Sequence, residues 1–370
     1  MRIVMDVREA QLSRVGVAVY CGNLLKKFSY YSSEIEFIFI ASEEMDDLVI
    51  DVNGLDVRYI APSINSPLKS KLKWYWNLPV MLSEFGADLY FGPLMFFPFR
   101  KFRCKTVFTL HDAASITTPE LVGSKLSWIK NLFFTKNWVR KVDGIVCISN
   151  YCQLEFSEAL SIDISRKSRI IYHGVPEEMV KSGGGVLHRP VEGRYLVTVG
   201  TVYSKKNFRR LIEAFSMLED TNISLVICGA RGADADTIYS APEEYGVDGR
   251  VIFAGRVSND DLIRYLSYAD AFVFPSLYEG FGIPILEAFS RDLPLISSNS
   301  TCLPEIAGDA AIYFDPENTK DMAEKIEMVL KSTTLAEELV IKGRARLKDF
   351  SWEKSAKEHI EYFKEICQGE

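Results

Sequence analysis

Short apolar runs, rich in β-branched and aromatic residues, recur along the whole chain, and most are followed by residues with helical spacing. Runs that are apolar on both faces predict strands of a parallel sheet with helices on both sides. The first series covers residues 2–7, 36–42, 56–60, 87–92, 105–112, 144–149 and 169–174. The second covers residues 195–200, 223–229, 250–255, 271–276, 294–299 and 310–314.

A polar segment, KSGGGVLHRPVEGR at residues 181–194, separates the two series. Glycine, proline and mixed charge are typical of a linker, and 370 residues suffice for two domains of ordinary size. We therefore predict an α/β fold with two doubly wound, Rossmann-like domains at residues 1–182 and 195–350, joined by a linker at 183–194. Facing each other, two such domains would enclose a cleft.

Glycine and polar residues gather where the predicted strands end. Ligands of doubly wound sheets bind at the carboxyl ends of the strands, so these residues are candidates for one site. They are His111, Ser149, His173, the stretch from Gly200 to Asn207, Gly229–Gly232, Gly255–Val257 and Glu279–Gly282.

The stretch SLYEGFGIPILEAF at residues 276–289 carries two glutamates on either side of a glycine turn that precedes a helix with Pro284 in its first turn. Glycines allow a ligand to approach the backbone, whose N–H groups at a helix start can bind phosphate or sugar oxygens. A carboxylate accepts two hydrogen bonds at once, which suits the vicinal diols of sugars and ribose. Glu279 and Glu287 therefore predict contacts with different parts of one elongated ligand. The alternative is that Glu279 caps the helix and Glu287 makes a surface ion pair.

A pair of lysines precedes another predicted helix in GTVYSKKNFRRLIEAF, residues 200–215, with Asn207 as its predicted N-cap. Lysines at a helix start oppose the helix dipole, so a bound anion would compensate for them. A diphosphate is such an anion, and Lys206 would act on it as a point charge. The alternative is a pair of exposed loop lysines.

Two residues of the first half are further candidates. Gly16 in SRVGVAVYCGNLL again lies between a strand and a helix, where its backbone N–H can reach a phosphate; the alternative is a plain turn. His111 in TLHDAAS ends a predicted strand. It is either a structural core histidine or a group that hydrogen-bonds a sugar hydroxyl.

Several classes of protein are excluded by missing motifs. The chain contains no GxGxxG, no Walker A motif and no GxSxG, which removes support for a dehydrogenase, a P-loop ATPase and an α/β-hydrolase. The seven cysteines are scattered, without CxxC, and the four histidines form no HxxxH pair, so no metal site is predicted. A net charge of −7 and the lack of a known motif argue against nucleic acid as a partner.

No apolar run reaches the roughly 18–20 residues of a membrane span, and the first residues lack the pattern of a signal peptide. We therefore expect a cytoplasmic location. Residues 66–141 nevertheless interleave Lys and Arg with Trp and Phe. This pattern predicts either solvated helix faces over an aromatic core or a surface that meets anionic lipid headgroups.

Together these motifs resemble the retaining glycosyltransferases of family four, which have the GT-B fold. VGTVYSKKNFRRLIEAF resembles the lysine–asparagine phosphate loop of that family, and FAGRVSNDDLIRYLSYADAFVFPSLYEGFGIPILEAF resembles its paired-glutamate signature. STCLPEIAGDAAIYFDP is similar to the segment that follows the signature. The first half matches more loosely, through MDVR, RVGVAVYCGNLL, TLHD, IVCIS and IIYHGV.

The resemblance implies a nucleotide-sugar donor that lies across the interdomain cleft. Glu287 would hold the ribose hydroxyls and His111 would contact the transferred sugar. Glu279 would bind that sugar together with the backbone N–H groups of Gly280, Phe281 and Gly282. Lys206 would neutralise the diphosphate, helped by Gly16 and with Lys205 beside it. Ile283, Gly200 and Thr201 would be further donor-binding residues. The base would lie between Arg231 and the Arg256–Val257 loop. Residues 351–370 would form a closing helix that packs back on the first domain, and no metal would be required.

The motifs SLYEGFGIP and TLHD are most similar to those of mannosyltransferases that use GDP-mannose in surface-polysaccharide assembly, such as O-antigen synthesis. The implied acceptor is a glycan or lipid-linked saccharide, with peripheral contact at the inner face of the membrane through residues 66–141. A UDP-sugar donor is the main alternative. A GT-B nucleotide-sugar epimerase or a non-catalytic sugar-nucleotide-binding protein are others.

The chain departs from the family pattern at two positions. Thr201 stands where many members have an arginine, which would place more of the phosphate neutralisation on Lys206. Asp292 stands where the helix after the paired glutamates often ends in glycine.

Overall fold

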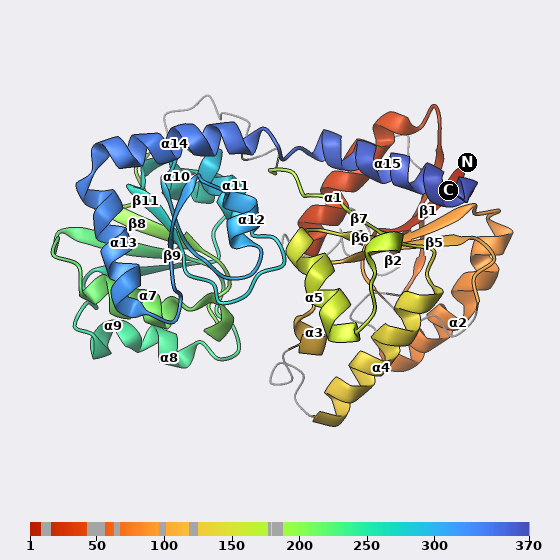
Figure 1. The fold of residues 1–370 in the computed structure, drawn as a ribbon, viewed down its shortest axis with the longest axis horizontal. Coiled ribbons are helices and arrows are strands. Elements are labelled where there is room, and N and C mark those ends of the chain that lie inside the picture. Colours follow the sequence, from red (N-terminus) through yellow and green to blue (C-terminus); the bar gives the residue numbers. More distant parts are fainter. Residues whose placement is uncertain are drawn as a thin grey trace. The chain divides into compact units, whose positions relative to one another are not determined.

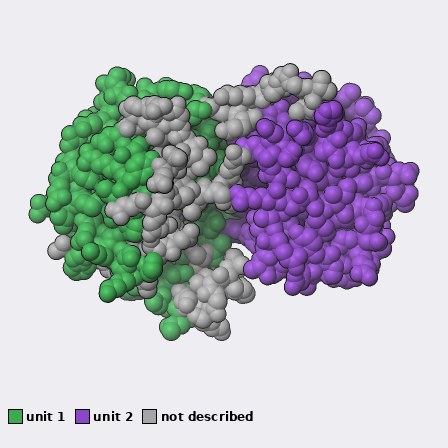
Figure 2. All heavy atoms as spheres, turned by 180° about the vertical axis from the view of Figure 1, so that it is seen from behind, with its two compact units in different colours: residues 1–174, 351–370 green, residues 175–350 purple. Residues whose placement is uncertain are grey.

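The computed structural model describes residues 1–8, 16–42, 56–62, 67–95, 101–117, 125–176, 179 and 188–369. It divides into two compact units, which Figure 2 distinguishes by colour: unit 1 combines residues 1–174 with 351–370, and unit 2 holds residues 175–350. Unit 1 therefore ends at Gly174 rather than at residue 182. One contact that ties the following segment to unit 2 is a hydrogen bond from Arg291 to the Met179 carbonyl. Residues 183–187 of the predicted linker lie outside the described residues.

Unit 1 is built on a seven-stranded parallel sheet of order β3-β2-β1-β4-β5-β6-β7. The chain order reverses direction between β1 and β4, as in other doubly wound sheets. The strands are β1 (Arg2–Asp6), β2 (Glu36–Ser42), β3 (Asp56–Ala61), β4 (Leu89–Gly92), β5 (Lys105–Leu110), β6 (Gly144–Cys147) and β7 (Ser168–Ile170).

Helices cover both faces of this sheet (Figure 1). One face carries α1 (Val17–Phe28) and α15 (Trp352–Gln368), and the other carries α2 (Leu68–Glu84), α4 (Lys125–Lys141) and α5 (Asn150–Leu160); α3 (Ala114–Thr117) is a single turn. No described helix has both the length and the apolar character needed to cross a bilayer.

The last helix, α15, belongs to unit 1 although the whole of unit 2 precedes it in the chain. Lys27 of α1 forms an ion pair with Glu353, and a side chain on Gly174 would clash with the backbone of Trp352, because its Cβ would lie 2.3 Å from the Trp352 nitrogen. The close approach of these two backbones requires glycine at residue 174.

Unit 2 is built on a six-stranded parallel sheet of order β10-β9-β8-β11-β12-β13, so its chain order reverses between β8 and β11. The strands are β8 (Arg194–Val199), β9 (Ile223–Cys228), β10 (Val251–Gly255), β11 (Ala271–Phe274), β12 (Leu295–Ser298) and β13 (Ala311–Phe314). The helices are α7 (Phe208–Ser216), α8 (Asp236–Tyr239), α9 (Ala241–Glu244), α10 (Asn259–Tyr268), α11 (Ile283–Phe289), α12 (Leu303–Ala307), α13 (Thr319–Lys331) and α14 (Thr333–Leu347). The two parallel sheets confirm the predicted fold class.

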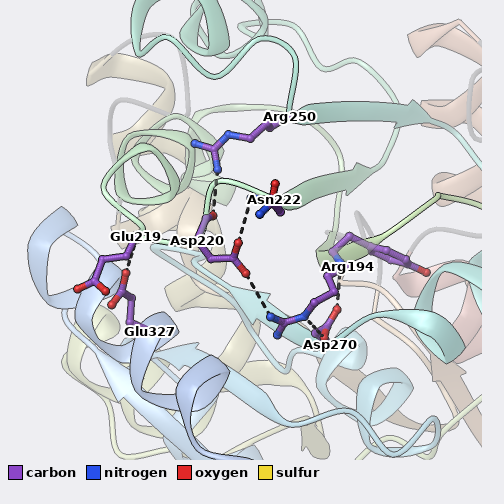
Figure 3. Close-up of polar contacts among 8 residues, drawn as sticks. Arg194, Glu219, Asp220, Asn222, Arg250, Asp270 and Glu327 are labelled. Atoms are coloured by element: carbon purple, nitrogen blue, oxygen red, sulfur yellow. Dashed lines mark hydrogen bonds and ion pairs between the residues drawn. The ribbon is translucent and has the colours of Figure 1, made fainter.

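The amino ends of four strands of unit 2 are tied together by polar contacts (Figure 3). Arg194, which begins β8, donates to Asp270 (2.9 Å) just before β11 and to Asp220 (3.2 Å). The backbone of Asp220 and its carboxylate also accept hydrogen bonds from Arg250 and Asn222, which precede β10 and β9. This edge of the sheet is therefore held by contacts within the protein, and the carboxyl edge is where the candidate residues lie.

Candidate active site

Four loops of unit 2 follow the carboxyl ends of β8, β9, β10 and β11, and backbone hydrogen bonds join each loop to the next. These bonds run from Gly229 to the Gly255 carbonyl (2.8 Å), from Val202 to the Ala230 carbonyl (2.8 Å) and from Leu277 to the Lys205 carbonyl (3.0 Å). The last bond joins the loops on either side of the point where the strand order reverses, which is the ligand site of doubly wound sheets.

The loop after β9 passes so close to the loop after β8 that it requires glycine at residue 229. A Cβ on Gly229 would lie 1.8 Å from the Gly200 carbonyl oxygen, and Gly200 itself has a φ of +156°. Because the obstructing atom belongs to the backbone, rotation of a side chain cannot relieve the contact.

Gly229→Ala is therefore expected to destabilise unit 2 by at least about 2 kcal/mol, seen as a lower melting temperature. Gly249→Ala is the matched control, because an added Cβ there has no neighbour within 4 Å, and it should leave the melting temperature unchanged or slightly higher. Equal melting temperatures for the two variants would contradict the close approach of the loops.

Lys206 and Glu279 form an ion pair across these loops, 73 residues apart in the chain. Each side chain is 14% exposed. Thr301 and Cys302, in the loop after β12, hold the backbone of Glu279: its N–H donates to the Thr301 hydroxyl (3.2 Å) and its carbonyl accepts from the Cys302 thiol (3.3 Å). Neither Thr301 nor Cys302 was predicted from the sequence to belong to the site. Their position in the segment STCLPEIAGDAAIYFDP is the only sequence signal that points to them.

The alternative of two exposed loop lysines is wrong. Lys205 and Lys206 are both half-buried, and the Lys205 ammonium lies 4.3 Å from the ring centroid of Tyr278. Asn207 is the N-cap of α7, as predicted, and has a left-handed conformation. Its side chain makes no capping bond, however, and donates to the carbonyls of Pro275 (3.1 Å) and Pro316 (2.8 Å). Its amide thus joins two loops rather than a helix end.

Glu287 lies on α11 with a half-buried carboxylate, for which the described residues provide no hydrogen-bond or ion-pair partner. Burial raises the pKa of Glu287 from its usual 4.5 to about 7. The alternative of a surface pair is therefore wrong for Glu287. The alternative of a helix cap is wrong for Glu279, because Gly282 is the N-cap and no side chain bonds there. Pro284 lies in the first turn as predicted.

The turn between the glutamates is anchored by an aromatic side chain. Phe281 is buried and packs edge-on against Phe350, while Gly282 has a φ of +96° that favours glycine. Gly280 precedes them and Ile283 begins α11. Because the ring of Phe281 is buried in this packing, only the backbone of Phe281 can contact a ligand.

The departure at Asp292 has a local explanation. This residue has a φ of +57°, which glycine adopts more easily, and its carboxylate accepts two hydrogen bonds from Arg344 at 2.5 and 2.8 Å. The guanidinium lowers the pKa of Asp292. A bidentate ion pair thus offsets the less favourable backbone conformation.

The residues predicted to flank a base lie in separate local environments. Arg231 pairs with Asp236 and lies over the ring of Tyr239, 4.6 Å from its centroid. Arg256 and Val257 line a hollow of about 430 Å³ whose lining also includes Arg189 and Arg264, but not Arg231. Thr201 is half-buried beside Gly229, close to the lysine loop.

Gly16 and His111 belong to unit 1. Gly16 is the N-cap of α1 with a φ of +35°, and no described atom lies within 4 Å of where its Cβ would be. Residues 13–15 of its motif lie outside the described residues. His111 Nε2 lies 2.8 Å from the Pro93 carbonyl oxygen, so Nε2 carries the proton. Burial lowers the pKa of His111 to about 4, which makes the ring neutral at pH 7 and leaves Nδ1 as an acceptor.

Among the described residues, no three His, Cys, Asp or Glu side chains lie close enough together to hold a metal ion. Among the predicted site residues, the groups that can bind or stabilise a polar ligand are the Lys206 ammonium, the carboxylates of Glu279 and Glu287, and the neutral imidazole of His111.

Comparison with known proteins gave two family models and several relatives. The model for Glycosyl transferases group 1 matches residues 186–346, and the model for Glycosyltransferase Family 4 matches residues 15–178. O-antigen chain mannosyltransferase B of Escherichia coli is 29% identical over 298 residues, which are 76% of this chain and 76% of that protein.

Two solved structures share the fold over nearly the whole chain. Sucrose-phosphate synthase from Thermosynechococcus elongatus is 18% identical with a TM-score of 0.77 and covers 100% of both chains. HepE from Anabaena in complex with UDP and glucose is 17% identical with a TM-score of 0.76, over 98% of this chain and 99% of that one.

Proposed function

The chain belongs to the family four glycosyltransferases of the GT-B fold, and on that premise we propose that it transfers mannose from GDP-mannose to a glycan or lipid-linked acceptor in surface-polysaccharide assembly. The name of the E. coli relative, an O-antigen chain mannosyltransferase, supports mannose. A UDP-sugar donor is the second candidate, which the UDP and glucose bound by HepE favour.

One observation carries the donor site: the Lys206–Glu279 pair joins the loops after β8 and β11, and the helix that follows, α11, bears Glu287, for which the described residues provide no partner. An ammonium group has three N–H donors, so Lys206 can keep Glu279 and still donate to a diphosphate. Glu279, held in place by Lys206, accepts hydroxyls of the sugar. Glu287 accepts the ribose diol, which supplies the partner that its half-buried carboxylate lacks.

Transfer with retention of configuration then needs no nucleophilic side chain. The bond between the anomeric carbon and the diphosphate breaks to give an oxocarbenium-like centre, and the acceptor oxygen bonds to that carbon on the face from which the diphosphate leaves. The leaving diphosphate oxygen takes the proton of the acceptor hydroxyl. The enzyme contributes positioning and fixed charges. Lys206 stabilises the diphosphate, and the Nδ1 atom of His111 accepts a hydrogen bond from a sugar hydroxyl. These cationic and polar groups replace a divalent cation.

The test is a panel of melting curves with GDP, UDP, ADP and their sugar conjugates in the presence of EDTA, repeated with Glu287→Ala. A nucleotide at about 100 times its Kd stabilises the fold by about 2.7 kcal/mol. A shift with GDP and GDP-mannose that the variant loses supports the proposal. A shift with UDP alone would identify a UDP-sugar, and not GDP-mannose, as the donor. A shift that requires divalent cation overturns the metal-free mechanism, and the absence of any shift overturns the donor site.

We also propose a cytoplasmic location with peripheral contact at the inner face of the membrane, through α2 and α4. Helix α4 contains basic residues and no Asp or Glu. Leu126, Ile129 and Phe133 follow each other at helical spacing on α4, and they are 72%, 54% and 63% exposed. Leu72, Trp76 and Val80 are exposed at similar spacing on α2, on the same face of the sheet (Figure 1). Residues 66, 96–100 and 118–124 of this region lie outside the described residues.

The expected result is salt-sensitive sedimentation with vesicles that contain phosphatidylglycerol and little with pure phosphatidylcholine. Replacing Ile129 and Phe133 together by serine should lower the vesicle partition coefficient at least about a hundredfold, because each side chain contributes about 1.5–3 kcal/mol when buried and every ~1.4 kcal/mol is a factor of ten. Ile341→Ser is the matched control, since Ile341 is 65% exposed on α14 of unit 2. Equal binding of all three proteins would contradict this surface.

A further inference from the structure

A buried cluster in unit 1 connects the last helix of the chain to the strand that carries His111. Tyr20 of α1 is fully buried, and its hydroxyl lies 2.8 Å from Nε2 of His359 and 2.8 Å from the hydroxyl of Thr109. His359 belongs to α15, and Thr109 belongs to β5, two residues before His111. All three partners are buried.

The direction of these hydrogen bonds follows from their acceptors. Nδ1 of His359 lies 2.7 Å from the Ser355 carbonyl oxygen, so Nδ1 carries the proton. Burial lowers the pKa of His359 to about 4, and the ring is therefore neutral with Nε2 as an acceptor. The Tyr20 hydroxyl must donate to that nitrogen, which leaves the Thr109 hydroxyl to donate to Tyr20.

The ring of Tyr20 also packs against His111. The two ring centroids lie 5.0 Å apart at an interplanar angle of 84°. His111 is held on its other side by the bond from Nε2 to the Pro93 carbonyl. A ring with one fixed nitrogen and an edge-on aromatic neighbour has little freedom to turn, so the direction of Nδ1 depends on where Tyr20 lies.

We propose that Tyr20 and His359 are positioning residues for His111: α15 fixes the Tyr20 hydroxyl, and the Tyr20 ring fixes the imidazole that faces the sugar. The inference rests on the proposed function for the role of His111. It extends that function by making sugar transfer depend on a residue of the last helix.

Two further titratable groups lie near His111 and could affect its pKa. Asp112 follows it in the chain and raises its pKa, and the neutral ring of His173 lies 6.0 Å away, ring centroid to ring centroid. Burial, together with the neighbouring His111 and His359, lowers the pKa of His173 well below its usual value. Access of water to the imidazole, which Tyr20 and its neighbours limit, is therefore what governs the pKa of His111.

The experiment compares His359→Leu, His359→Gln and Tyr20→Phe. His359→Leu leaves the Tyr20 hydroxyl without its acceptor and should lower kcat about tenfold. The Kd of the nucleotide should stay unchanged, because Glu287 and Lys206 belong to unit 2. His359→Gln keeps an acceptor at similar reach and should restore most of kcat. Tyr20→Phe loses the same bond without leaving a tyrosine donor unpaired, and it should behave like His359→Leu.

The second readout is independent of activity. The chain has four histidines, so the NMR signal of the His111 ring can be assigned with His→Gln variants. Its titration midpoint near pH 4 should rise by at least about one pH unit in His359→Leu and return in His359→Gln. An unchanged midpoint together with a kcat within twofold of wild type overturns the inference, as does an equal loss of kcat in the leucine and glutamine variants. If the wild-type protein transfers no sugar, the proposed function fails, and the titration still decides the positioning role.

Discussion

Replacing Lys206 by methionine lowers kcat for sugar transfer by about 10²–10³-fold, the usual cost of removing one preorganised charge that stabilises a leaving group. Lys206 faces Glu279 in a site where both side chains are mostly shielded from water. Its removal therefore has two effects: the diphosphate loses its counter-charge, and the Glu279 carboxylate loses the group that holds it in place. The measurement is single-turnover transfer with saturating donor, which separates chemistry from binding.

Lys331→Met is the matched control. Lys331 also pairs with a glutamate, Glu327, but it is 56% exposed at the surface of unit 2. Exposed pairs contribute about 0–1 kcal/mol to stability and nothing to a distant site. We expect its kcat to equal that of wild type. A Lys206→Met enzyme with a rate within threefold of wild type would remove Lys206 from the mechanism.

Replacing Glu287 by glutamine should change binding and stability in opposite directions. The nucleotide Kd should rise about ten- to a hundredfold, because hydrogen bonds to a charged group contribute about 1.5–3 kcal/mol. Without nucleotide, the variant should be more stable than wild type at pH 8 by about 1–3 kcal/mol, because it no longer buries an unpartnered negative charge. A site that is prepared for a ligand is thus less stable when that ligand is absent.

The pH dependence of this gain has a definite sign. The pKa of Glu287 is about 7 in the folded protein and near 4.5 when unfolded, so the folded state binds more protons between these values. The stability of wild type therefore falls as the pH rises from 4.5 to 7, whereas Glu287→Gln lacks this contribution. Melting curves at pH 5 and pH 8 should show the gain mainly at pH 8. Glu338→Gln, at an exposed pair with Lys342, should show no gain at either pH. A gain of the same size at both pH values would contradict the titration of Glu287.

Much of the fold was predictable because buried parallel strands have a simple pattern. The runs at residues 223–229 and 271–276 contain β9 and β11. Their carboxyl ends meet at one edge, so Lys206 and Glu279 could be assigned to one candidate site before any contact was known. The ion pair between them agrees with that placement.

Contacts between distant segments were not predictable in the same way. Asn207 was interpreted from its local position before a helix, but carbonyls of two other loops compete for its amide. Tyr20 and His359 are 339 residues apart, and neither has a neighbour in sequence that indicates the other. The Thr301 hydroxyl contacts the backbone N–H of Glu279, and a contact with the backbone cannot be inferred from the type of the residue that it belongs to.

The return of α15 to unit 1 has a consequence for synthesis on the ribosome. Unit 2 is a continuous segment, while unit 1 needs residues from both ends of the described chain. A domain can fold as soon as all of its residues have left the ribosome. Unit 2 therefore has every residue of its core before Trp352 and His359 are made, whereas unit 1, which is translated first, has to wait for α15 to complete its packing. The apolar surface of α1 that α15 covers stays exposed for the whole time that unit 2 is being translated. During this period that surface is available for a chaperone to bind.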